Sequence, residues 1–213
     1  MNEVAPAPDQ AAPVVVAGVA PVARLVTAAL LRTGHHVVGL VDPLDDTEPE
    51  PGELAADLDA GRTDGRYLLT DEPAAGAGFT IALVTEPPDD DAALSPAERY
   101  TAALAPHLRP GGLLVVSSPT AEHAGGVVAA TVELLTGLRA GADYALAHLF
   151  GPVSDGRLIV SGIDVASATR AEQWLAAVGL SVMPVLPVAA AEVVAGLLAR
   201  ASRPDGETDP GDG

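Results

Sequence analysis

The 213 residues of this chain suffice for one well-buried domain, and an aromatic content of only 3% predicts a core of Ala, Val and Leu. With 29 acidic and 11 basic residues the net charge is −18, so we expect neither a nucleic acid nor a membrane as a partner. The chain has no cysteine and no lysine, which excludes disulfides, thiolate metal sites, cysteine nucleophiles and lysine chemistry.

Two tails flank the predicted domain. Residues 1–12 and 201–213 are rich in Pro, Gly, Ala and Asp and have little to bury, so both are predicted to be disordered around one domain at 13–200. The first tail lacks the basic start and apolar stretch of a secretory signal. No apolar run reaches the roughly 20 residues that span a bilayer. We therefore expect a cytoplasmic protein.

Apolar runs of strand length alternate with segments of helical period along the domain. Val14–Ala17 predicts a first strand, Pro21–Arg32 an amphipathic helix closed by Gly34, and His36–Val41 a second strand. The other predicted strands are Tyr67–Leu69, Thr80–Val84, Leu113–Val116, Ala145–Ala147, Leu158–Val160 and Val182–Val185, and the other predicted helices are Glu53–Asp59, Pro96–His107, Glu122–Thr136, Ser167–Val178 and Ala189–Arg200.

The helix predicted from Pro96 has the clearest start signal in the chain. Ser95 is its expected N-cap, Pro96 takes the first helical position and Glu98 completes a capping box. Together, the alternating elements predict a doubly wound α/β domain of Rossmann type. Its sheet is expected to be mainly parallel, with helices on both faces.

The loop after the first predicted strand is an altered dinucleotide-binding fingerprint. The three glycine positions of G-x-G-x-x-G read Gly18, Ala20 and Ala23. Gly18 keeps the tight turn, Ala20 adds a methyl where a pyrophosphate approaches, and Pro21 removes an N–H from the anion-binding helix start. Asp42 lies where an acid binds the adenosine ribose, which favours NAD over NADP. The loop predicts a weakened NAD site; the alternative is a plain strand-to-helix turn.

Longer segments resemble the N-terminal domain of the UDP-glucose/GDP-mannose dehydrogenase family, in the family's order. "GHHVVGLVD" resembles its G-H-x-V-x-G-x-D segment, and "PEPGELAADLDAGR" with "LLTDEP" is similar to its E-P-G-L and T-T-D segments. "VTEPPDDDAALSPAERYTAALAPHLRPGGLLVVSS" resembles its V-P-T-P loop, helix and following strand, and "PVLPVAAAEVVAGLLAR" the start of its long helix. The resemblance runs from Val14 to Leu198.

This resemblance implies an NAD-dependent, two-step oxidation of a sugar-nucleotide alcohol to an acid through an enzyme thioester. The thioester needs a cysteine, which this chain lacks. The family's lysine and asparagine in A-E-x-x-K-L-x-x-N correspond to Ala195 and Ala199, and Glu86 replaces a threonine that contacts the cofactor. We therefore predict no catalytic residue and no complete dehydrogenase reaction.

The fingerprint and the resemblance together predict a cofactor site at the ends of four strands. Its expected residues are Gly18, Val19, Ala20, Pro21, Val22, Asp42, Thr85, Glu86, Ser117 and Ser118. NAD is the expected cofactor and a nucleotide sugar the expected second ligand. Three functions stay open: an NAD-binding pseudoenzyme or half of a split system, a regulatory or scaffold module without cofactor, and a small oxidoreductase that performs one hydride transfer.

The remaining polar and aromatic groups predict ordinary structure. Asp89–Asp91 is expected to be a solvated loop, and no two of the five histidines have the i, i+4 spacing of a helical metal site, so no metal is predicted. Trp174 is expected to pack in the core or an interface. The apolar helix Ala189–Arg200 is expected either to fold back on the sheet or to make a homodimer or protein-partner contact.

Overall fold

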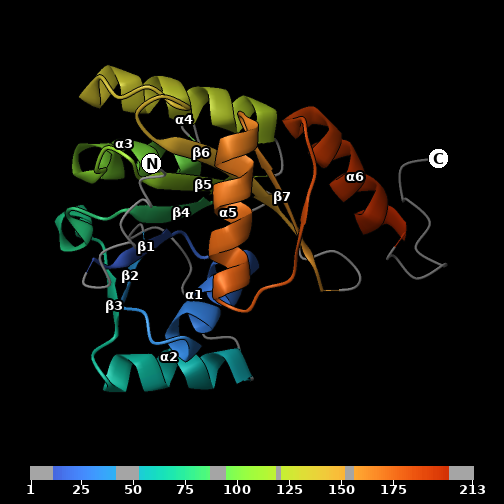
Figure 1. The fold of residues 1–213 in the computed structure, drawn as a ribbon. Coiled ribbons are helices and arrows are strands. Elements are labelled where there is room, and N and C mark those ends of the chain that lie inside the picture. The colour runs from blue at the N-terminus through green and yellow to red at the C-terminus, as the bar shows by residue number, and fades with distance from the viewer. Residues whose placement is uncertain (1–11, 42–52, 87–94, 119–120, 152–155, 202–213) are drawn as a thin grey trace, which may run out of the picture.

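A computed structural model of the protein describes residues 12–41, 53–86, 95–118, 121–151 and 156–201. Its eight-stranded sheet has the order β3-β2-β1-β4-β5-β6-β7-β8 (Figure 1). The strands are β1 (Val14–Ala17), β2 (Val37–Leu40), β3 (Tyr67–Thr70), β4 (Ile81–Thr85), β5 (Leu113–Ser117), β6 (Ala145–Phe150), β7 (Leu158–Gly162) and β8 (Val182–Pro184).

Six α-helices connect these strands or follow them. They are α1 (Pro21–Arg32), α2 (Glu53–Thr63), α3 (Pro96–Leu104), α4 (Ala121–Thr136), α5 (Val165–Ala177) and α6 (Val188–Ala201). Two short 3₁₀ turns, η1 (Pro73–Gly76) and η2 (Ala105–His107), complete the described elements. The predicted Rossmann-type α/β architecture is therefore confirmed, with boundaries that shift by a few residues.

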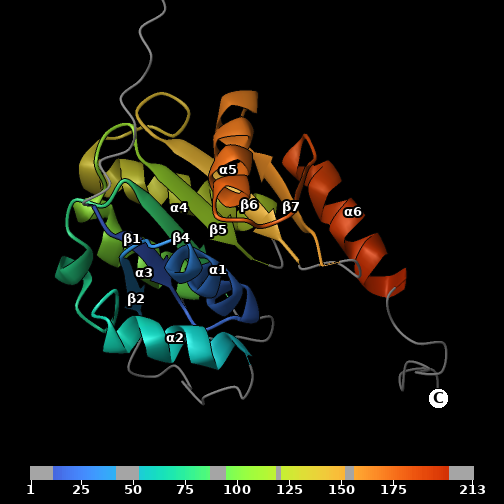
Figure 2. The ribbon, with the colours of Figure 1, turned by 60° about the horizontal axis from the view of Figure 1, so that its bottom comes forward.

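Alternation along the strands divides the core into two layers. Val14 and Val16 of β1 belong to one apolar cluster, whereas Val15 and Ala17 belong to the other. The first cluster includes residues of α1 and α5, and the second includes residues of α3 and α4, which lie on the opposite side of the sheet (Figure 2). Helices therefore cover both faces, and the inner strands are buried on both sides, whereas the edge strands β3 and β8 are partly exposed.

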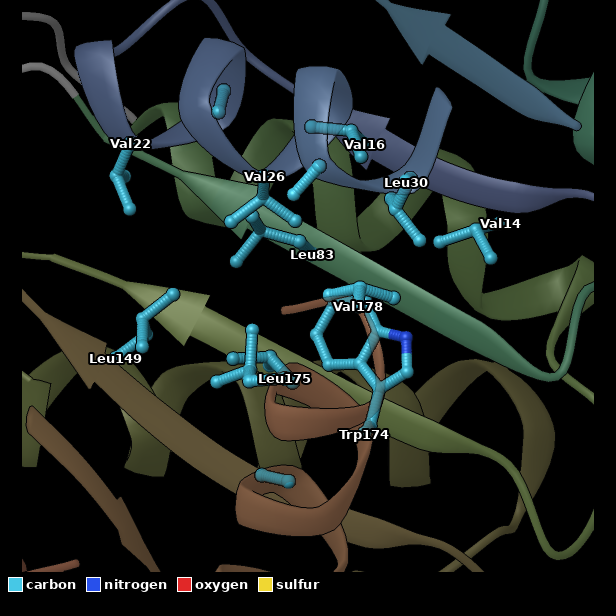
Figure 3. Close-up of a cluster of buried hydrophobic side chains, with 14 of the residues drawn as sticks. Val14, Val16, Val22, Val26, Leu30, Leu83, Leu149, Trp174, Leu175 and Val178 are labelled. Carbon is cyan, nitrogen blue, oxygen red and sulfur yellow. The ribbon is translucent and has the colours of Figure 1, made fainter. Parts of the chain in front are cut away.

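Trp174 packs in the first of these layers. Its side chain, from α5, lies among Val26 and Leu30 of α1 and Val14 and Leu83 of the sheet (Figure 3). The residue is only 9% exposed, so the predicted packing role is confirmed as a core contact. In a chain with few aromatic residues, this ring joins residues of α1, α5 and the sheet in one apolar cluster.

The strand order of the sheet reverses at β1. Strands β2 and β3 lie on one side of β1, and β4 and β5 lie on the other. All of these strands pair in parallel, so their carboxyl ends share one edge. The switch between β1 and β4 creates the crevice in which open α/β sheets bind ligands.

Several details differ from the sequence-based expectation. The pair β6–β7 is antiparallel, whereas β7 and β8 pair in parallel, so these last two strands run opposite to the six other strands of the sheet. Strand β6 continues beyond the predicted Ala147 to Phe150, and α2 continues to Thr63. Helix α6 includes Ala201, which the tail prediction had assigned to 201–213. Residues 1–11 and 202–213 lie outside the described residues.

Candidate functional site

Gly18 forms the turn that leaves β1 toward α1. Its φ of +95° is a backbone conformation that residues with a side chain rarely adopt. A Cβ there would lie 2.5 Å from the Thr85 hydroxyl oxygen and 2.7 Å from the Thr85 carbonyl oxygen. The Gly18 N–H donates to the Leu40 carbonyl at 2.9 Å. Both backbone conformation and space therefore demand glycine at this position.

Helix α1 begins immediately after this turn and has no side-chain cap. Ala20 is the N-cap residue, Pro21 takes the first helical position, and the first turn contains no acidic residue. Among the residues that the structure describes, none accepts a hydrogen bond from the N–H of Val19, Ala20 or Val22. A helix start with such N–H groups and a positive dipole end favours an anion.

The side chains of this loop do not all face the crevice. Ala20 and Val22 are only 6% and 4% exposed and belong to the apolar cluster beneath α1. Val19 is half-buried, and Pro21 is exposed. The Ala20 methyl is therefore largely covered by protein, and the missing N–H of Pro21 is the clearer departure from an anion-binding loop.

Thr85, at the end of β4, is tied to β1. Its fully buried hydroxyl donates to the Ala17 carbonyl at 3.0 Å. This hydrogen bond adds a side-chain link between β1 and β4, the two strands that flank the switch point. A cofactor contact of Thr85 remains a prediction from the sequence, since its hydroxyl proton is used within the protein.

Glu86 directs its carboxylate to the start of α3. Glu86 Oε1 accepts from the Ala97 N–H at 3.2 Å, while the Glu86 N–H donates to the Ser117 carbonyl at 2.9 Å. The predicted capping box is also present, with Ser95 Oγ accepting from the Glu98 N–H and the Ser95 N–H donating to Glu98 Oε2. Glu86 therefore adds a second negative group to a helix start that is already capped.

The register brings the other predicted residues to the same edge. Thr85 pairs with Ser117 across β4 and β5, one row above Ala17 and Val84. Ser117 and Ser118 are both buried, with 9% and 5% exposure. Asp42 lies outside the described residues. The structure thus places the Gly18 loop, Thr85, Glu86 and the two serines at the same edge of the sheet, and their contacts with a cofactor remain predictions.

Sequence reasoning missed a cavity that adjoins this loop. About 130 Å³ of space lies between α1, α2 and the β1–β3 part of the sheet, and its lining includes Gly18, Val19, Gly39 and Tyr67. The signal in the sequence was Gly39, because an isolated glycine within a buried strand indicates a close approach of another group.

His148 is buried in β6 under helix α4. A Cβ on Gly125 would lie 2.2 Å from its Cε1 and 2.6 Å from its Nε2, so the ring packs against the helix backbone. Burial lowers the pKa of His148 to about 4, which keeps the ring neutral at pH 7. Ser161 is its cross-strand partner, and neither His148 Nδ1 nor Ser161 Oγ has a hydrogen-bond partner within the described part of the chain.

The described ranges contain neither a metal-binding cluster nor a membrane-spanning helix. No three His, Asp or Glu side chains come together there as a metal-binding group. The predicted solvated loop at Asp89–Asp91 lies outside these ranges. No helix among the described elements is both long enough and apolar enough to cross a bilayer.

The sequence matches no protein-family model and no curated protein. The structure is nevertheless similar to solved enzymes. A UDP-D-ManNAc dehydrogenase from Pyrococcus horikoshii has a TM-score of 0.71 at 24% identity, over 85% of this chain and 48% of that one. A GDP-mannose dehydrogenase from Pseudomonas aeruginosa gives 0.68 at 18% identity, over 86% and 48%.

An imine reductase from Myxococcus stipitatus, solved in complex with NADP+, has a TM-score of 0.57 at 17% identity, over 89% of this chain and 60% of that one. The chain has a Rossmann-like fold. It spans about half the length of the sugar-nucleotide dehydrogenases, which fits an N-terminal domain. The resemblance seen in the sequence is thereby confirmed at the level of the fold.

Proposed function

We propose that this chain is an NAD-binding-type domain related to the N-terminal halves of nucleotide-sugar dehydrogenases, with weakened cofactor affinity and no complete dehydrogenase reaction of its own. The observation that carries the proposal is the start of α1. It combines a required glycine, N–H groups without partners among the described residues, and a place at the β1–β4 switch point.

The residues present fit part of a dinucleotide. The Val19 N–H and the dipole of α1 would hold the diphosphate, and Gly18 would let the chain approach it closely. NAD, when bound, supplies a hydride acceptor. Two features oppose tight binding, namely the missing N–H of Pro21 and the negative charge of Glu86 near the same edge. We therefore expect millimolar affinity.

Complete oxidation of a sugar alcohol to an acid is outside the chemistry of these 213 residues. The thioester route needs a thiolate, and the sequence contains neither cysteine nor lysine. We propose a pseudoenzyme, or one half of a split system whose other half supplies the nucleophile. A nucleotide sugar as second ligand, a cytoplasmic location and disordered tails at 1–12 and 201–213 belong to the same proposal.

A second candidate function is a regulatory or scaffold module that has lost the cofactor. Helix α6 favours it, because Val193 and Leu197 are 62% and 58% exposed while Ala191 packs onto Phe150 and Ile159. The helix stands at the end of the molecule beyond β7 (Figure 2). In this alternative, the exposed apolar side chains bind a protein partner or a second copy of the chain.

The deciding experiment is a calorimetric NAD titration of the wild-type chain and of Pro21→Ala. The variant restores one N–H at the helix start, so NAD is expected to bind a few-fold more tightly. Pro110→Ala, at an exposed turn after η2, is the matched control and is expected to leave the affinity unchanged. No NAD response from either wild type or Pro21→Ala at several millimolar contradicts the first function and favours the module.

A parallel assay tests the remaining alternative of one hydride transfer. UDP-glucose is added to the protein with NAD, and NADH absorbance is followed. We expect no signal above the buffer control. Steady NADH formation by the purified chain would overturn the proposal of incomplete chemistry.

A further inference from the structure

The last peptide unit of β1 is held from both neighbouring strands. The Ala17 carbonyl accepts from the Thr85 hydroxyl of β4 at 3.0 Å, and the Gly18 N–H donates to the Leu40 carbonyl of β2 at 2.9 Å. These two bonds lie on opposite edges of one planar unit, so they leave the peptide between Ala17 and Gly18 little freedom to rotate. The unit that enters the turn is therefore fixed on both sides of the switch point.

The Thr85 hydroxyl also lies against the glycine of the turn. A Cβ on Gly18 would come within 2.5 Å of Thr85 Oγ1, closer than real Cβ atoms approach another atom. The absence of a side chain at Gly18 thus lets the hydroxyl reach the Ala17 carbonyl. Thr85 and the turn at φ +95° fit together as one arrangement, from which α1 begins.

Burial separates Thr85 from any external ligand. The residue is 0% exposed, and its single hydroxyl proton is donated to the Ala17 carbonyl. The side chain therefore offers a ligand neither a donor nor contact area. Val19, by contrast, is only half-buried and directly follows the turn. An effect of Thr85 on a bound anion must pass through the backbone of the turn.

We propose that Thr85 is a positioning residue, whose hydroxyl fixes the Ala17–Gly18 peptide and thereby the direction of the Val19 and Ala20 N–H groups at the start of α1. The inference rests on the proposed cofactor site, in which the start of α1 would hold the diphosphate. Donors whose direction is set before the ligand arrives bind an anion more tightly, because binding then does not have to order the loop.

Amide hydrogen exchange of the whole chain without NAD tests the positioning directly. The N–H groups of Gly18 and Val14 lie at the two ends of β1, and they donate to the carbonyls of Leu40 and His36, both at 2.9 Å. Thr85→Ala is expected to speed exchange at Gly18 about tenfold and to leave Val14 unchanged, because only the Gly18 end loses a neighbouring bond. A merely stabilising role would accelerate both equally, and that result, or unchanged exchange at Gly18, would overturn the proposal.

Two further variants separate the hydroxyl from the loss of buried atoms. Thr85→Ser keeps the hydroxyl and is expected to keep slow exchange at Gly18. Thr101→Ala removes the same atoms from a threonine of α3 that is 1% exposed and whose hydroxyl has no hydrogen-bond partner within the described ranges. This control is expected to leave Gly18 unchanged, and urea denaturation verifies that each variant is folded. Fast exchange at Gly18 in a folded Thr85→Ser chain would contradict the role of the hydroxyl.

A calorimetric NAD titration of the same variants connects the turn to the ligand. Thr85→Ala is expected to bind NAD a few-fold more weakly than the wild type, and Thr85→Ser with wild-type affinity. Equal NAD affinity in the wild type and Thr85→Ala would overturn the positioning role. No NAD binding by the wild type contradicts the proposed function instead, while exchange at Gly18 still decides whether Thr85 fixes the turn.

Discussion

Helices α1 and α3 begin at the same edge of the sheet, but only the first turn of α3 is capped by side chains. The start of α3 receives the Ser95 capping box and, in addition, the carboxylate of Glu86. The start of α1 has no side-chain cap and no acid. Both ends carry the same partial positive charge, and the described part of the chain supplies acceptors to the start of α3 but none to the start of α1, which favours an external anion there. This contrast is the physical basis of the proposed cofactor site.

The largest expected effect comes from destroying the turn before α1. Gly18→Ala forces a residue with a Cβ into φ +95° and into Thr85, so we expect the free energy of unfolding to fall by about 3 kcal/mol. Urea denaturation measures this loss. Gly34→Ala is the control, because Gly34 has a similar φ of +85° but open space around it, and about 1 kcal/mol is expected. Equal losses would show that the Thr85 contact is unimportant.

A third helix, α4, is expected to make the stability of the fold depend on pH. Its Gly125 packs against the buried ring of His148. The pKa of His148 is lowered from 6.5 to about 4 in the folded chain. Below pH 6.5 the unfolded chain therefore binds a proton that the folded chain does not. The free energy of unfolding should fall by up to about 3 kcal/mol between pH 6.5 and 4 and lose no more from this residue below pH 4.

Denaturation curves across this pH range test the histidine effect. His148→Leu is expected to remove this part of the pH dependence. Because carboxylates also titrate at the lower end, the difference between wild type and His148→Leu is the quantity compared. An identical pH slope in both proteins would contradict the prediction.

Removing the cap of α3 sharpens the contrast between the two helix starts. Ser95→Ala leaves the Glu98 N–H without its partner, and we expect a loss of about 1 kcal/mol in the free energy of unfolding. NAD affinity should not change, since the deleted group belongs to the closed helix start. A change in NAD affinity as large as that of Pro21→Ala would mean that the two starts are not independent.

The smallest effect is expected from neutralising Glu86. Glu86→Gln keeps an oxygen that can accept from the Ala97 N–H and removes only the charge, so stability should change by about 0.5 kcal/mol. NAD should bind slightly more tightly in low salt, and the gain should vanish as ionic strength rises. A calorimetric titration at two salt concentrations measures both, and weaker NAD binding in the variant would contradict the proposed repulsion.

Much of the fold could be predicted, and less of the site. The run Val14–Ala17 and the period of Pro21–Arg32 identified β1 and α1 because strand burial and helix amphipathicity repeat along the chain. Gly18 was recognised for the same reason, as a glycine between two such segments. The direction of β7 was not predictable in this way, because a strand reads the same whether its neighbour runs parallel or antiparallel.

By itself, the sequence determined the order of strands and helices, the capped start at Ser95 and the lack of any thiol or amine nucleophile, since all of these are local or compositional. Only the tertiary structure decided that Glu86 accepts a hydrogen bond from the Ala97 N–H, that Tyr67 lies over Gly39, and that His148 packs against Gly125. Each of these pairs joins residues on different elements. Their contact depends on strand order and helix packing, which no single stretch of the chain encodes.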